Sequence, residues 1–171
     1  MSLQDGSPCR SQGSQFNGSQ RTICSRPEGL SRLVFEDERV GQWVKARVHT
    51  GNTWNGQYRA IGIEREGNLI AGVVYTDCSA ANISAHIAGE GNWCSRRFLR
   101  AAFGYPFLQL KVRRITAYVA ARNTKARTFV KDLGFDYESR MERALKDDDF
   151  IVYRMFRENC KWVNPVTHRS P

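Results

Sequence analysis

The chain has 171 residues, of which 41% are hydrophobic and 11% aromatic, and it carries a formal net charge of +9. This length suits one domain with a core of ordinary size, and the composition excludes a wholly disordered protein. The sequence contains no apolar run of about 18 residues and no signal peptide, so we expect a cytoplasmic protein that does not contact the membrane.

The sequence divides into a central domain and two tails. Residues 1–28 are rich in Ser, Gln and Gly and poor in core-forming side chains, which is typical of a flexible tail. We expect a single domain over residues 29–163 and a second tail over residues 164–171.

The first half of this domain predicts a strand, a helix and a three-stranded meander. The strand is expected at Leu30–Phe35. Glu36 and Asp37 then place negative charge at the start of a helix, where the helix dipole favours it. Its apolar face consists of Val40, Trp43, Val44 and Val48. After a loop at Asn52–Gln57, alternation and apolar runs predict strands at Tyr58–Arg65, Leu69–Thr76 and Asn82–Ala88.

The second half predicts a broken helix, a strand, a short helix and a hairpin. Pro106 removes a backbone donor from the helix expected at Ser95–Leu110, so we expect a break near Ala102–Tyr105. A strand follows, with apolar alternation at Ile115, Ala117 and Val119. A helix then shows apolar residues at spacings of three and four, and Gly134 is expected to end it. The hairpin strands are expected at Asp136–Arg143 and Phe150–Phe156.

Positive charge is concentrated between Gly91 and Lys131, where no Asp or Glu occurs. Such a segment attracts a polyanion, either a coenzyme with several phosphates or a nucleic acid, and composition does not separate the two. A solvated basic face is the third interpretation. The basic residues are Arg96, Arg97, Arg100, Lys111, Arg113, Arg114, Arg122, Lys125, Arg127 and Lys131.

The cysteines and histidines do not form a metal-binding pattern. An odd number of cysteines without C-x-x-C spacing is typical of thiols in a reducing compartment, and the histidines do not join them at zinc spacing. We therefore expect no metal. The residues concerned are Cys9, Cys24, Cys78, Cys94 and Cys160, with His49, His86 and His168.

The order of strand, Asn123, short helix and Leu133-Gly134-Phe135 resembles the GNAT superfamily of N-acetyltransferases. It looks like the branch that acetylates the N-termini of ribosomal proteins and like similar proteins of prophages. The resemblance extends, less tightly, from about Leu33 to Trp162. It implies an α/β fold with a mixed, largely antiparallel sheet flanked by helices. In this sheet the parallel fourth and fifth strands splay apart, and acetyl-CoA lies between them.

By this resemblance the loop after the third meander strand holds the coenzyme pyrophosphate. Gly89 and Gly91 would let the backbone approach the phosphates, because they lack a Cβ. Ser95 is a good N-cap for the next helix, and Arg96 and Arg97 place cations in its first turn, which suits a bound anion. However, the spacing departs from the usual GNAT loop, and a plain strand-to-helix turn is the alternative.

Three further residues are coenzyme candidates by resemblance, each with a structural alternative. Asn123 would hold the pantetheine arm, but it is also a preferred N-cap residue. Phe129 would lie beside the thioester arm, or it is a core aromatic. Arg127 would approach the adenosine phosphates, or it is a surface charge.

Catalysis of acyl transfer needs an oxyanion donor, a base and an acid. The resemblance implies a backbone N–H donor around Ile87 and Ala88. Many relatives supply the acid with a tyrosine at the position occupied here by Val130. The remaining candidates are His86 and Glu90 as base and Tyr118 as acid. Alternation places His86 on the strand face of Ser84 and Ala88. A structural histidine, a plain loop carboxylate and proximity alone are the alternatives.

The resemblance implies an N-acetyltransferase that acts on a protein N-terminus, a lysine or a small amine, as a monomer or homodimer. Two other functions remain open. The basic segment suggests a GNAT enzyme that modifies nucleic acid, such as a tRNA-linked amine or a DNA base. Val130 suggests a catalytically degenerate domain that binds acyl-CoA and regulates a partner.

Overall fold

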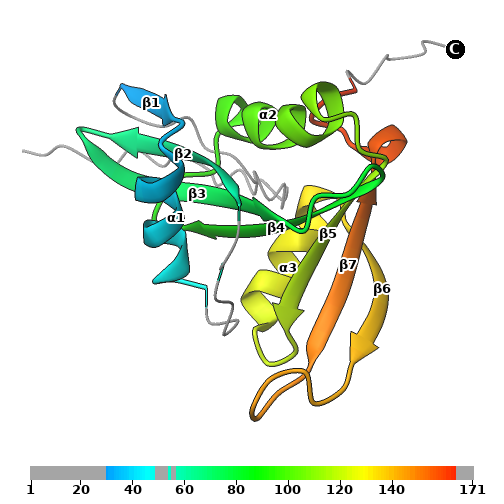
Figure 1. Ribbon diagram of the computed structural model, residues 1–171. Helices are drawn as coiled ribbons and strands as arrows, with labels where there is room; N and C mark the ends of the chain where they lie inside the picture. The colour runs from blue at the N-terminus through cyan, green and yellow to red at the C-terminus, as the bar shows by residue number, and fades with distance from the viewer. Residues whose placement is uncertain (1–29, 49–53, 55–56, 165–171) are drawn as a thin grey trace, which may run out of the picture.

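A mixed seven-stranded sheet forms the centre of the computed structural model, which describes residues 30–48, 54 and 57–164 (Figure 1). The strand order is β1-β2-β3-β4-β5-β7-β6, and β4 and β5 are parallel while the other neighbours are antiparallel. The strands are β1 (Ser31–Val34), β2 (Arg59–Arg65), β3 (Asn68–Thr76), β4 (Asn82–Gly89), β5 (Arg114–Ala120), β6 (Asp136–Met141) and β7 (Phe150–Phe156). The predicted sheet is confirmed. The predicted tails lie outside the described residues, apart from Asn164, as does most of the Asn52–Gln57 loop.

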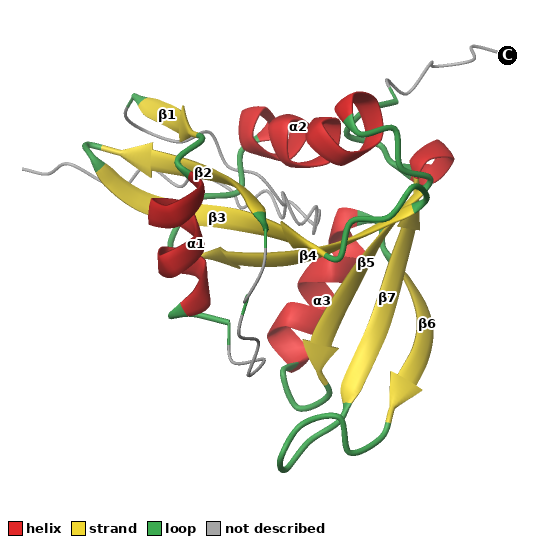
Figure 2. Cartoon of the chain, in the orientation of Figure 1, coloured by secondary structure: helices red, strands yellow, loops and turns green. Residues whose placement is uncertain are grey.

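Helices cover both faces of the sheet (Figure 2). Helix α1 (Asp37–Lys45) packs Val40 and Val44 against β2 and β3 on one face. Helices α2 (Arg96–Gly104) and α3 (Thr124–Leu133) lie on the other face, over the larger apolar core. Two short segments complete the described helices, namely the π-helix η1 (Tyr105–Gln109) and the 3₁₀-helix η2 (Arg157–Asn159).

The break expected in the helix after β4 is confirmed. Ser95 caps α2, and its Oγ accepts a hydrogen bond from the backbone N–H of Phe98 at 3.2 Å. The regular α-helix ends at Gly104, and the chain continues as η1 with Pro106 in its first turn. Proline at this place has no N–H to donate to the preceding turn, which explains why the α-helical pattern does not continue.

Helix α3 begins and ends as its sequence predicts. The Oδ1 of Asn123 accepts a hydrogen bond from the backbone N–H of Ala126 at 3.0 Å, so this asparagine is the N-cap. Gly134 adopts φ 108°, a left-handed conformation that a residue with a Cβ adopts only with strain. The turn brings Phe135 into the core, where its ring lies 6.0 Å from that of Phe103.

Strands β4 and β5 pair only at their beginnings. The parallel register joins Asn82 to Arg114, Ile83 to Ile115 and Ser84 to Thr116, and it stops there. Beyond this point β4 continues to pair with β3, and β5 continues to pair with β7. The two strands therefore diverge from an apex at Ser84 and Thr116, as the resemblance implied.

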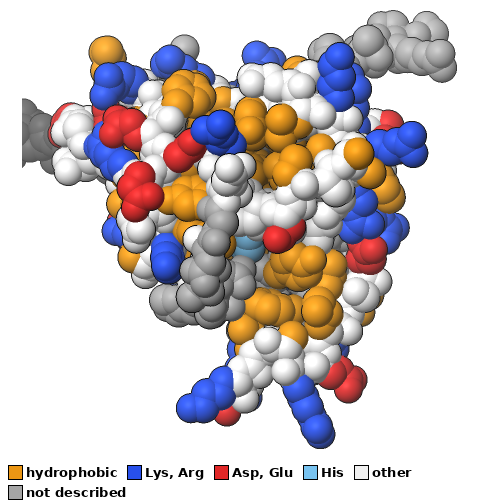
Figure 3. Space-filling model, viewed as in Figure 1, with side chains coloured by type: hydrophobic (Ala, Val, Ile, Leu, Met, Phe, Trp, Pro, Cys, Tyr) orange, Lys and Arg blue, Asp and Glu red, His pale blue; other side chains and the backbone are white. Residues whose placement is uncertain are grey.

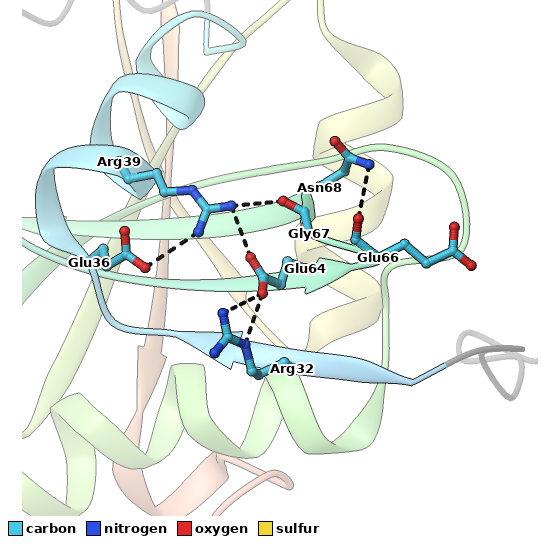
Figure 4. Close-up of polar contacts among 7 residues, drawn as sticks. All are labelled: Arg32, Glu36, Arg39, Glu64, Glu66, Gly67 and Asn68. Carbon is cyan, nitrogen blue, oxygen red and sulfur yellow. Dashed lines mark hydrogen bonds and ion pairs between the residues drawn. The ribbon is translucent and has the colours of Figure 1, made fainter.

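A buried carboxylate joins β1, α1 and β2. Glu64 is only 4% exposed, and its two carboxylate oxygens accept hydrogen bonds from Arg32 and Arg39, each at 2.9 Å (Figure 4). Arg39 also donates to the carbonyl of Gly67 at 2.9 Å. The hydrogen bond from Arg32, followed by that from Arg39, holds the pKa of Glu64 below its usual value of 4.5 although burial opposes this.

We expect Glu64→Gln to lower the urea midpoint of unfolding at pH 7. Because the folded-state pKa is lowered, the ionised carboxylate stabilises the fold above about pH 4.5, and this contribution is lost as the pH falls through the lower folded value. Equilibrium unfolding at pH 7 and in acid measures the effect. The control is Glu66→Gln in the next turn, whose side chain points away from both arginines (Figure 4). Equal midpoints for the two variants at pH 7 would contradict this role.

Candidate functional site

A cleft of about 620 Å³ opens between the diverging ends of β4 and β5. The residues that follow α1 and one face of α3 complete its walls. Its volume lies in the range of about 300–1,000 Å³ that is typical of small-molecule sites. The lining residues from the two strands and the loop after β4 are Ala85, His86, Ile87, Ala88, Gly89, Glu90, Trp93, Ala117, Tyr118, Val119 and Ala120. The remaining lining residues come from the segment after α1 and from α3 with its N-cap, namely Ala46, Arg47, Val48, Asn123, Lys125, Ala126, Phe129 and Val130.

The β4 residues that line the cleft point alternately to the two faces of the sheet. Ala85 and Ile87 of β4 pack toward the core under α2 and α3. His86 points to the opposite face, where its ring lies 5.6 Å from that of Trp54, and Ala88 packs there with the α1 cluster. The alternation predicted for β4 is therefore confirmed. Figure 3 shows this second face, where hydrophobic side chains gather around a visible histidine.

His86 lies in the cleft wall as a buried, neutral imidazole. It is 5% exposed, and its Nε2 lies 3.0 Å from the Oγ1 of Thr76. Burial lowers the pKa of His86 from 6.5 to about 4, although the negative charge of Asp77 opposes this shift. An imidazole with so low a pKa is a weak proton acceptor at neutral pH, since an efficient general base has a pKa near the working pH.

Glu90 is engaged by a neighbouring arginine. The Nε of Arg47 lies 2.8 Å from the Oε1 of Glu90, and the guanidinium of Arg47 lies 3.8 Å from the centroid of the Trp43 ring. The Glu90 side chain is 61% exposed, so water also reaches it. This geometry gives the carboxylate a structural partner, and the sequence alone did not indicate it.

Tyr118 lies in the β5 wall of the cleft. Its half-buried ring is 5.9 Å from that of Phe150 on β7. Alternation along β5 places Ile115, Ala117 and Val119 in the core under the helices and therefore Tyr118 on the opposite face. It shares that face with His86. Two of the three catalytic candidates thus line the two strands at the same side of the cleft.

The loop after β4 is organised by Trp93, which the sequence did not single out. A Cβ on Gly89 would lie 2.2 Å from Cε2 of the indole, so the missing side chain of Gly89 makes room for Trp93. The indole then packs on Phe129 of α3 at 5.2 Å and edge-on against Phe98 of α2 at 5.8 Å. Gly91 adopts φ 61° in open space. A structural reason therefore exists for Gly89, whereas approach to phosphate was the reason expected.

Five of the predicted coenzyme residues do not line the cleft. Gly91 and the arginines at 96 and 97 are exposed, and Ser95 is buried as a helix cap. Arg97 donates to the carbonyl of Ser31 at 3.3 Å. Arg127 turns away toward a second hollow, where it donates to the carbonyl of Ala121 at 3.1 Å and to the hydroxyl of Tyr153 at 3.4 Å.

The other predicted residues do come together. Eight line the cleft, namely His86, Ile87, Ala88, Gly89, Glu90, Tyr118, Asn123 and Phe129. Val130, the position at which the resemblance led us to expect a tyrosine, also lines it. Sequence reasoning missed Arg47, Trp93, Lys125 and Ala126. For Ala126, the position one turn before Val130 on the same helix face was an available signal.

The basic residues between Gly91 and Lys131 do not gather at the cleft. Only Lys125 among the ten lines it. Arg114 is paired with Glu138 on β6, at a distance of 2.5 Å. The positive charge is therefore spread over α2, α3 and the strand ends, and the cleft itself is mainly apolar.

Comparison with known proteins identifies the fold. No protein-family model and no curated protein matches the chain. A solved structure of a mutant of the spermidine N-acetyltransferase SpeG from Vibrio cholerae is similar, with 17% identity, 78% of this chain and 96% of that chain covered, and a TM-score of 0.63. The N-acetyltransferase PseH from Campylobacter jejuni gives 14% identity, 75% and 99% coverage, and a TM-score of 0.53. The chain thus has a GNAT-like fold. No helix in the described part has both the length and the apolar character to cross a membrane.

Proposed function

We propose that the chain is an N-acetyltransferase that transfers an acetyl group from acetyl-CoA to a primary amine. The observation that carries this proposal is the divergence of β4 from β5 after three paired positions, which opens the cleft of about 620 Å³. The N-acetyltransferase names of the similar structures support it. The amine belongs to a protein N-terminus, a lysine or a small molecule, and the ribosomal-protein branch and a prophage origin remain predictions.

The residues of the cleft suit a thioester arm. Beyond Ser84 and Thr116 the register gives β4 no partner in β5, so backbone groups on that edge can meet the arm. Asn123 and the apolar side chains of Ala126 and Phe129 form the α3 wall. When bound, acetyl-CoA supplies the activated acyl group.

The chain's own groups then act on the two reactants. Backbone N–H groups around Ile87 and Ala88 donate to the oxyanion that forms during attack. His86 is neutral, and it positions the acceptor amine on its side of the cleft. The proton that the amine loses passes to water. Tyr118 lines the cleft with a hydroxyl, and with valine at position 130 it is the residue that would donate a proton to the coenzyme thiolate. Holding both reactants in one cleft contributes much of the rate.

A regulator that binds acyl-CoA without catalysis is the second candidate, because Val130 lines the cleft without a hydroxyl. The test has two parts. A ligand that binds only the folded state at 100 times its dissociation constant adds about 2.7 kcal/mol, so acetyl-CoA should raise the unfolding midpoint. Mass spectrometry of candidate amines then detects acetyl transfer. Stabilisation without transfer to any amine favours the regulator, and no stabilisation contradicts both.

Trp93 should report binding of the coenzyme. Because its indole forms part of the cleft wall, we expect acetyl-CoA to change the tryptophan fluorescence, and Trp93→Phe to remove most of that change. The matched control is Trp162→Phe. That indole lies outside the cleft lining and donates to the carbonyl of Leu133 at 3.0 Å, so its loss should leave the change intact. A full change in the Trp93 variant would show that the coenzyme binds elsewhere.

A further inference from the structure

A small apolar cavity lies in the core directly behind the apex of the cleft. Its volume is about 30 Å³. The single hydroxyl among its lining side chains, that of Tyr75, is already donated to the carbonyl of Ala102. The lining residues are Val73, Tyr75, Ala85, Ile87, Ala102, Phe103, Ile115, Ala117, Val130, Leu133 and Phe135.

The cavity and the cleft share four lining residues. Ala85, Ile87, Ala117 and Val130 line both spaces. Ala85 and Ala117 are the first residues of β4 and β5 after pairing stops, so the common boundary is the apex itself. Ala85, Ala117 and Val130 have short side chains, so the boundary is thin beside the larger Ile87.

We propose that this cavity receives the end of an acyl chain longer than acetyl, so that the protein accepts a propionyl thioester. The inference rests on the proposed function, because it needs a thioester in the cleft. With phosphates near the loop after Gly89 and the oxyanion donors around Ile87, the acyl end of the donor points toward the apex. The valine at position 130 carries no bulk beyond its two methyl groups, so at this wall only a short side chain separates the acyl carbons from the cavity.

The size and polarity of the cavity select the ligand class. A space of about 10–15 Å³ holds a water, but a water needs about two to four polar partners, and the single hydroxyl among the lining side chains, that of Tyr75, already donates to the carbonyl of Ala102. A cavity of about 30 Å³ therefore suits a methyl or methylene group. The transfer itself is balanced as for acetyl: the amide C–N bond forms, the C–S bond breaks, the amine loses one proton and the coenzyme thiolate gains one.

Calorimetric titration with acetyl-CoA, propionyl-CoA and butyryl-CoA tests the inference. Propionyl-CoA should bind about fourfold more tightly than acetyl-CoA, which is the factor for one buried methylene group. Ala102→Val fills the cavity from α2 without touching the cleft, so it should abolish this preference and keep the affinity for acetyl-CoA. Val73→Ala enlarges the cavity from β3 and should move the preference toward butyryl-CoA.

The outcomes separate this inference from the proposed function. If acetyl-CoA binds and propionyl-CoA binds no more tightly, the acyl cavity is wrong and the proposed function stands. A propionyl preference that persists in Ala102→Val also overturns it. If none of the three thioesters binds, both proposals fail. Should Ala102→Val not fold, Val73→Ala decides, since an unchanged preference there contradicts the inference.

Discussion

Replacing Ala126 by tryptophan is expected to abolish the binding of acetyl-CoA. Ala126 lies on the first half of α3, partly buried, and its side chain lines the cleft beside Asn123 and Phe129. An indole at this position would occupy the space that the proposal gives to the thioester arm. We expect the dissociation constant to rise at least about 100-fold, a loss of about 2.8 kcal/mol. Calorimetry and the coenzyme-dependent shift of the unfolding midpoint measure it.

The same helix offers a matched control. Thr128 is exposed and does not line the cleft, so Thr128→Trp adds the same side chain to α3 without filling the site. It should bind acetyl-CoA as the wild type does. If Ala126→Trp folds and retains its affinity, the coenzyme does not lie between β4 and β5. The transfer activity should fall together with the affinity in Ala126→Trp only.

The elements around the cleft follow closely from local sequence signals. Asn123 and Gly134 fix the two ends of α3, because a side-chain cap and a left-handed glycine act within one turn of the chain. Pro106 likewise ends α2 through its own missing donor. These signals need no knowledge of distant residues. They placed the two ends of α3, which lines the cleft, and the end of α2, which covers the core behind it.

The contacts within the site depend on residues far apart in the sequence. Arg47 reaches Glu90 across 43 positions, and nothing near Glu90 indicates that partner. Trp93 fills the space above Gly89 because α3 brings Phe129 beside it. The sequence therefore allowed two explanations for Gly89, approach to a phosphate or space for a neighbouring side chain. Only the three-dimensional arrangement shows that the Trp93 indole occupies this space. The function of a loop glycine is thus poorly determined by its spacing alone.

The position of the basic side chains also could not be predicted from the sequence alone. A segment without acids predicts a positive field, but its side chains leave α2, α3 and β5 in several directions. Arg127 bonds to a carbonyl and Arg114 to a carboxylate. Only Lys125 remains at the cleft. Linear clustering of charge therefore indicates a binding site only when one element presents it on one face.

The stability of the protein should depend on pH through His86. The unfolded chain binds a proton at this side chain near pH 6.5, whereas the folded protein does so only near pH 4. Because the folded pKa is depressed, acid favours the unfolded state between these values. At about 1.4 kcal/mol for each pH unit, lowering the pH from 6.5 to 4 removes about 3 kcal/mol from the free energy of unfolding. His86→Gln cannot titrate and should lack this loss.

The comparison of wild type and His86→Gln cancels the other titrating groups, since both proteins share them. Urea unfolding at pH 7, 5.5 and 4 should show the wild type losing about 3 kcal/mol of unfolding free energy relative to the variant as the pH falls, and a constant difference between the two proteins would contradict the lowered pKa of His86. The same variant decides its role in transfer. Loss of a general base costs about 100-fold or more, so a decrease in kcat of less than about tenfold makes His86 a positioning residue. Because a buried imidazole of low pKa is a poor proton acceptor, we expect the smaller loss, together with a rate that does not follow the titration of His86.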